Sequence, residues 1–161
     1  MPKQPRIYTP EEAFGRLADA CARAEYCTRE LRDKLRRMRV APDDAEKIVR
    51  RLVDGRFADD ERYARAFARQ KASLAHWGRR KIAYALAAKS IQRDIAAEAI
   101  AAIDAEVFRA GVAAVVAAKV RSLGPECLES YEGRTRVFRH AASRGFGADE
   151  IAEELRRLMK K

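Results

Sequence analysis

The 161-residue sequence predicts an all-α protein of three tandem three-helix repeats in an elongated, curved array. Hydrophobic residues make up 48% of the chain, many of them alanine, and only 7% is aromatic, which favours helices packed over small side chains. The prolines, at positions 2, 5, 10, 42 and 125, leave long stretches free to be helical. The strongest observation is that one apolar pattern occurs three times.

The three copies of the pattern start at equivalent positions, Leu31, Ile82 and Val137. The residues 4, 9, 18 and 21 positions after each start are apolar in every copy. This spacing predicts a helix, a tight connection with a buried residue, and a second helix. The residue 12 positions after each start is always aspartate, which we expect to cap the second helix or complement its dipole. These aspartates are Asp43, Asp94 and Asp149.

Another amphipathic segment precedes each helix pair, over residues 9–24, 59–75 and 106–123. Thr9 and Pro10 form the N-cap and first residue of the first helix. In the second, Asp59, Asp60 and Glu61 open the helix, and Phe67 and Leu74 are expected to face the core. The third has an apolar face of Val112, Val115, Val116, Val120 and Leu123.

The predicted domain organisation is a flexible tail over residues 1–8 and repeats over residues 9–56, 57–105 and 106–161. The repeat starts are 51 and then 55 residues apart, and a longer loop over residues 124–133 explains the excess. A unit of this size buries little surface alone, so neighbouring repeats must stabilise one another.

The chain is strongly basic, with 34 Lys and Arg against 24 Asp and Glu and a net charge of +10. This favours a polyanion or an acidic protein surface as partner. Between residues 62 and 93 there is no acidic residue, and the basic ones are Arg62, Arg65, Arg69, Lys71, Arg79, Arg80, Lys81, Lys89 and Arg93. A second basic stripe contains Arg29, Arg32, Arg36 and Arg39. If the repeats stack in register, equivalent helices form an extended positive surface.

Each basic residue has an alternative interpretation as part of a solvated helix face without a binding role, because charged runs usually form such faces. The triplet from residue 79 to residue 81 opens a helix, where cations oppose the dipole, so we interpret it as a binding feature. Reversing the three charges is expected to weaken binding and leave stability nearly unchanged. Trp77 is equally compatible with an exposed anchor and a packed linker.

No catalytic or metal-binding motif is found, so we expect neither an enzyme nor a cofactor. Cys21, Cys27 and Cys127 contain no CxxC pair and are interpreted as reduced thiols; Cys27, near a helix start, is the candidate for a lowered pKa. His76 and His140 have no second ligand at metal spacing. An enzyme using Asp60 or His140 is the least favoured hypothesis. No signal peptide or membrane-spanning run is found, which predicts a cytoplasmic protein.

The central motif resembles the RecX family: Asp60-Glu61-Arg62-Tyr63-Ala64-Arg65-Ala66-Phe67, then Trp77-Gly78-Arg79-Arg80-Lys81-Ile82, Leu86 and Lys89-Ser90-Ile91. Arg144-Gly145-Phe146, Ile151 and Leu155 match the family's C-terminal ending. The resemblance covers about residues 10–159. Ser90 departs from the usual glycine, and serine can adopt a left-handed turn there at modest cost.

The resemblance implies a regulator, expected to be monomeric, that binds the groove of a RecA recombinase filament on single-stranded DNA. It implies inhibition of ATPase, strand-exchange and coprotease activities in DNA repair, recombination and the SOS response. The expected contact residues are Arg69, Lys71, Arg79, Arg80, Lys81, Arg29, Arg32, Arg36, Arg62, Arg65 and Lys89. The alternative is a helical protein that binds DNA or RNA directly.

Overall fold

The computed structural model describes residue 1 and residues 6–161, and over these residues the chain is helical, without strands. The predicted flexible tail over residues 1–8 falls largely on residues 2–5, outside the described residues. The elements are α1 Pro10–Arg23, α2 Thr28–Arg37, α3 Pro42–Asp54, α4 Asp60–Ser73, α5 Arg79–Ala88, α6 Arg93–Ala101, α7 Ala105–Leu123, the 3-10 helix η1 Pro125–Leu128, α8 Tyr131–Ser143 and α9 Ala148–Met159. The predicted all-α class is confirmed.

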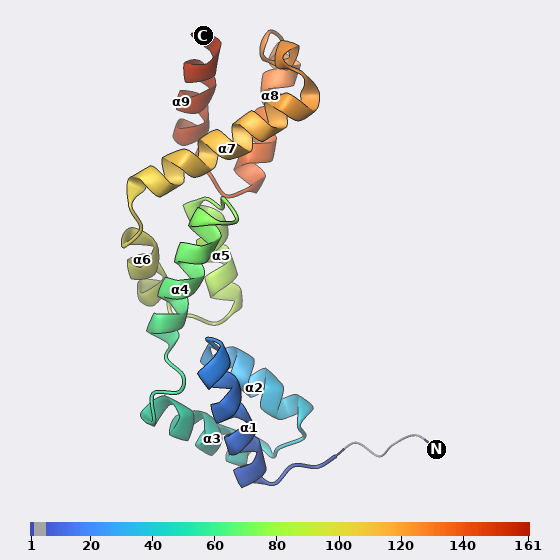
Figure 1. Cartoon of the computed structure of the whole chain (residues 1–161), viewed down its shortest axis with the longest axis vertical. Helices are drawn as coiled ribbons and strands as arrows, with labels where there is room; N and C mark the ends of the chain where they lie inside the picture. Colours follow the sequence, from blue (N-terminus) through green and yellow to red (C-terminus); the bar gives the residue numbers. More distant parts are fainter. Residues whose placement is uncertain (2–5) are drawn as a thin grey trace.

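The helices form three stacked groups, α1–α3, α4–α6 and α7–α9 (Figure 1). The buried apolar residues form three matching clusters. Cys27 of α2's N-cap and Phe108 of α7 both belong to the cluster of the middle group, so each neighbour contributes one buried side chain to it. The repeat boundaries at residues 56/57 and 105/106 stay a prediction.

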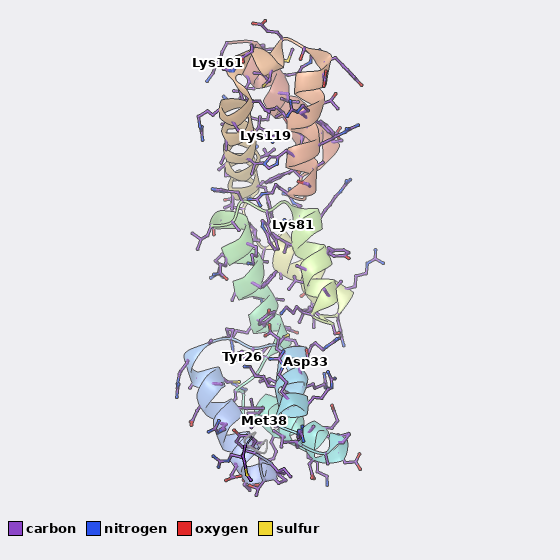
Figure 2. All side chains as sticks on the ribbon, turned by 90° about the vertical axis from the view of Figure 1, so that its right-hand side faces the viewer. Tyr26, Asp33, Met38, Lys81, Lys119 and Lys161 are labelled. Carbon is purple, nitrogen blue, oxygen red and sulfur yellow. The ribbon has the colours of Figure 1, made fainter. Side chains whose placement is uncertain are left out.

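Equivalent helices lie on the same side of the array. In Figure 1, α2, α5 and α8 lie on the right, and the edge that they form recedes at the middle group. Figure 2 views this side and labels Asp33 of α2 and Lys81 of α5. The fold therefore presents one long face rather than a closed site.

The turn after the second helix of each group is the most regular feature of the repeat. Its left-handed residues are Arg39 and Ser90, both with φ 58°, and Gly145 with φ 94°. The residue that follows each donates its amide to a carbonyl in the helix before: Val40 to Leu35 at 3.1 Å, Ile91 to Leu86 at 3.1 Å and Phe146 to Ala141 at 3.4 Å. Ser90, which stands where the RecX pattern usually has glycine, does adopt the left-handed conformation.

The helix starts follow the predicted capping chemistry in part. The Thr9 hydroxyl accepts the Glu12 amide at 3.2 Å, and Asp59 accepts the Arg62 amide at 3.0 Å. The aspartates 12 positions after each repeat start lie in the first turns of α3, α6 and α9 but accept no capping hydrogen bond, because the N-caps are Ala41, Gln92 and Gly147. Of the two predicted roles, only complementing the dipole fits.

Two local expectations are wrong. Leu74 is 75% exposed rather than core-facing. The buried face of α4 contains Ala64, Ala68 and Ala72, spaced by four residues, and a residue two positions beyond Ala72 lies on the far side of the helix. The loop expected over residues 124–133 is instead η1 followed by the first turn of α8.

None of the helices in the described part of the chain combines the length and apolar character needed to cross a bilayer.

Candidate partner-binding surface

The cations expected to bind a partner divide into two sets. Seven have a carboxylate oxygen within 4.0 Å and are Arg29, Arg32, Arg36, Arg62, Arg65, Arg79 and Lys89. The other four have no carboxylate partner among the described residues and are Arg69, Lys71, Arg80 and Lys81. The second set, all on α4 and α5, has charge available for a partner.

Several paired cations hold the first and second groups together. Lys89 lies 2.7 Å from Glu30, which also accepts the Tyr63 hydroxyl at 3.3 Å. The Glu30 carboxylate raises the pKa of Lys89, and burial, with Glu30 nearby, raises the pKa of Tyr63. Arg62 lies 2.7 Å from Glu25 and also donates to two linker carbonyls. These charged side chains therefore stabilise the junction between the first two groups.

Asp60 and Cys27 are structural at the same junction. Asp60 accepts the Thr28 amide at 2.8 Å and the Thr28 hydroxyl at 3.0 Å, so both carboxylate oxygens are engaged. Cys27 is fully buried, and burial raises the pKa of its thiol. The expectation of a lowered pKa at Cys27 is therefore wrong, because desolvation of the thiolate outweighs the helix start.

The junction between the second and third groups rests on close backbone contact. The Gly78 amide donates to the Arg144 carbonyl at 2.8 Å, and the Arg80 amide donates to the Gly145 carbonyl at 3.2 Å. Arg79 lies 2.8 Å from Glu150, with its guanidinium 4.0 Å from the Phe108 ring centroid. One member of the basic triplet is thus part of the junction.

Trp77 lies beside this junction with two free cations on its ring. The Lys71 Nζ is 4.8 Å and the Lys81 Nζ 4.5 Å from the ring centroid. The ring makes an edge contact with Phe67, with centroids 6.4 Å apart, and packs against the middle core cluster while staying partly accessible. Trp77 therefore packs against the core, as expected for a packed linker, and keeps part of its ring accessible, as expected for an exposed anchor.

The exposed face of α5 adds an aromatic residue that sequence reasoning missed. Tyr84 is 80% exposed, and Ala83 and Ala87 beside it are exposed as well. The apolar spacing of α5 could have revealed this exposure. Tyr84 is two residues from each of the core positions Ile82 and Leu86, so its side chain faces the opposite side of the helix. Small neighbours allow a partner to approach the helix closely around the tyrosine.

The chain is similar to known proteins in sequence and in fold. Residues 59–100 match the family model described as RecX, second three-helix domain. Regulatory protein RecX of Clostridium botulinum strain Eklund 17B is 29% identical over 125 residues, which are 78% of this chain and 58% of that protein. Regulatory protein RecX of Prosthecochloris aestuarii is 27% identical over 84% of this chain and 85% of its own length. The chain is therefore similar to RecX proteins in its second three-helix group and, at lower identity, over most of its length.

The solved RecX structures show the same fold. RecX from Lactobacillus salivarius superposes with a TM-score of 0.80 at 18% identity, covering 94% of this chain and 97% of that one. The chain spans about three fifths of the length of the clostridial RecX relatives that it matches, with 58% and 61% for two Clostridium botulinum proteins.

His140 is the remaining titratable residue that the sequence singled out as a catalytic candidate. Burial, together with Lys119 and Arg144, lowers the pKa of His140, which favours the neutral ring. Within the residues that the structure describes, no three His, Cys, Asp or Glu side chains are grouped to hold a metal ion.

Proposed function

We propose that this chain is a non-enzymatic regulator that binds the groove of a RecA recombinase filament on single-stranded DNA. In this role it inhibits the filament's ATPase, strand-exchange and coprotease activities and so modulates DNA repair and recombination. The supporting observation is the long face of α2, α5 and α8, with unpaired cations at its middle repeat (Figures 1 and 2). Similarity to proteins that are called regulatory protein RecX supports the same role.

An extended surface suits a repeating partner. Several weak contacts along one rigid array act together, because after the first contact the others form at high effective concentration. Tyr84 with its small neighbours gives α5 the character of a protein contact, since tyrosine is enriched among residues that dominate interfaces. Arg80 extends that contact with a free guanidinium one turn earlier on α5.

The first test compares two charge-reversal variants in an assay of recombinase ATPase on single-stranded DNA. Arg69→Glu with Arg80→Glu removes two unpaired cations, and we expect the inhibitor concentration for half-inhibition to rise about tenfold or more, which is about 1.4 kcal/mol. The control, Arg50→Glu with Arg121→Glu, changes the charge equally at exposed positions of α3 and α7. Its inhibition should match the wild type, and inhibition by the first variant at wild-type strength would contradict the proposal.

Arg79 is left out of this variant for a structural reason. Arg79→Glu would place a carboxylate beside Glu150 and uncover Phe108, so it would loosen the second junction as well as remove a cation. For this member we therefore expect a loss of stability, in contrast to the sequence-based expectation that reversing the whole triplet leaves stability nearly unchanged.

Direct binding to DNA or RNA is the second candidate function, favoured by four cations without carboxylate partners. Affinity for bare single strands would then fall linearly with salt on logarithmic axes, as phosphate contacts release counterions. Tight binding to bare DNA at physiological salt, without an effect on recombinase ATPase, would favour this alternative over filament regulation.

A further inference from the structure

Two lysines without carboxylate partners share one indole ring at the second junction. Lys71 comes from the last turn of α4 and Lys81 from the first turn of α5, so two elements bring the ammonium groups to Trp77 from different directions. The stretch that carries all three residues contains no acidic side chain. The cation–π contact holds each ammonium group in place but leaves its charge uncompensated.

The equivalent position in the first repeat provides an internal comparison. Tyr26 precedes the N-cap of α2 as Trp77 precedes the N-cap of α5, and the Lys34 Nζ lies 4.7 Å from the Tyr26 ring centroid. There, however, the carboxylates of Glu30 and Asp33 line the same cavity as Tyr26 and Lys34. The first repeat thus has an aromatic ring and a lysine with acids close by, whereas Trp77 has two lysines and no carboxylate paired with either.

We propose that Lys71, Lys81 and Trp77 form a binding site for the sugar–phosphate backbone of single-stranded nucleic acid. The ammonium groups donate to phosphate oxygens, and the accessible part of the partly buried indole offers a contact for an adjacent base. The proposal rests on the proposed function in that the filament groove presents single-stranded DNA as well as protein. It assigns this site to the DNA, and Arg80 and Tyr84 to the recombinase.

Phosphate fits this site better than the carboxylate of a protein partner. The lysine ammonium is a point charge that donates hydrogen bonds to phosphate oxygens from many directions, whereas paired recognition of a carboxylate favours the planar fork of arginine. Beside Trp77 the partly buried Phe67 ring extends the aromatic surface, with centroids 6.4 Å apart. Cations beside aromatic rings are the combination that binds single strands without sequence preference.

Trp77 is the only tryptophan, so its fluorescence reports directly on this site. The full chain is titrated with oligothymidylate, whose bases absorb little where tryptophan is excited, and the anisotropy of a labelled oligonucleotide measures binding independently. We expect saturable quenching of Trp77 together with the rise in anisotropy. Lys71→Gln with Lys81→Gln should raise the dissociation constant tenfold or more at low salt. It should also flatten the logarithmic salt slope by about 1.4, since each single-strand phosphate contact contributes about 0.7.

The matched control is Lys34→Gln with Lys47→Gln, which removes two charges from the first repeat, including the lysine on Tyr26. It should bind oligothymidylate with a wild-type salt slope. Circular dichroism checks that both variants are folded. A wild-type slope in the Lys71 and Lys81 variant, or saturation by anisotropy without a change in Trp77 fluorescence, would overturn the proposal.

The recombinase ATPase assay separates this inference from the proposed function. A chain that inhibits the ATPase but does not bind oligothymidylate through Trp77 refutes only the DNA site. A chain that binds oligothymidylate as expected but leaves the ATPase unaffected refutes only the regulatory function.

Discussion

The left-handed residue after the second helix of each repeat shows how a single position adapts to its neighbour. Arg39, Ser90 and Gly145 share this backbone conformation but meet different surroundings. Gly145 packs against the backbone of Gly78 and Lys81, which leaves no room for a side chain. The Ser90 hydroxyl accepts a hydrogen bond from Arg29 of the preceding repeat at 2.9 Å, so a side chain is useful there. Replacement of the family's usual glycine by serine is therefore tolerated at the first junction.

Gly145→Ala is predicted to destabilise the protein by about 2 kcal/mol or more. A Cβ there would lie 2.5 Å from the Lys81 amide nitrogen, and the φ of 94° is strained for any side chain. Gly15→Ala is the control, because a Cβ on Gly15 in α1 meets no atom within 4 Å. That change should stabilise the helix by about 0.5–1 kcal/mol. Chemical denaturation measures both, and equal stability of the two variants would contradict the close contact between repeats.

At the scale of elements, the start of α4 is both a helix cap and a link to α2. Asp60 and Glu61 both lie in its first turn and favour the helix dipole equally. Only Asp60 bonds Thr28 of α2, and Glu61 makes a looser 3.7 Å contact with Arg65. The two residues therefore separate the dipole effect from the link between helices.

Asp60→Ala is predicted to lower the free energy of unfolding by about 1–3 kcal/mol more than Glu61→Ala does. The reason is that Asp60→Ala leaves the Thr28 amide and hydroxyl without their partner. Thermal denaturation of both variants gives the difference, and hydrogen exchange at the Thr28 amide should accelerate only in the first. An equal loss of unfolding free energy in the two variants would mean that Asp60 stabilises the protein through the helix dipole alone.

The helices were predictable from sequence, and the contacts between them were not. Periodicity gave the valine face of α7, and Thr9 with Pro10 marked the start of α1, because both signals are local. The pairing of Arg79 with Glu150 joins residues far apart in sequence, and no spacing rule reveals it. The acid-free stretch thus overstated the free charge: its arginines and lysines are partly neutralised by carboxylates from other repeats. The cations that remain unpaired could be identified only in three dimensions.

For the whole molecule, the two junctions between repeats differ in kind. The first joins its repeats through side-chain hydrogen bonds and ion pairs around Glu30 and Asp60, and leaves a cavity of about 420 Å³ lined in part by Tyr26 and Tyr63. The second has one ion pair, Arg79 with Glu150, but rests mainly on backbone hydrogen bonds at Gly78 and on packing of α4 on α7. Ion pairs at half-exposed sites weaken with salt, whereas close backbone packing is less sensitive. The array should therefore bend at the first junction, which would let the first repeat adjust to a filament while the other two stay rigid.

Raising the salt from about 0.1 M to about 1 M is predicted to open the first junction selectively, since the Debye length falls to about 3 Å. Two amides report on the junctions, Thr28 bonded to Asp60 and Gly78 bonded to the Arg144 carbonyl. We expect hydrogen exchange at Thr28 to accelerate severalfold at high salt while exchange at Gly78 changes little. Amides inside α2 and α5 serve as controls, because a general loss of stability would accelerate these as well. If Gly78 exchanged as readily as Thr28, the backbone contact at Gly145 would be no firmer than the ion pairs of the first junction, and the array would bend at both.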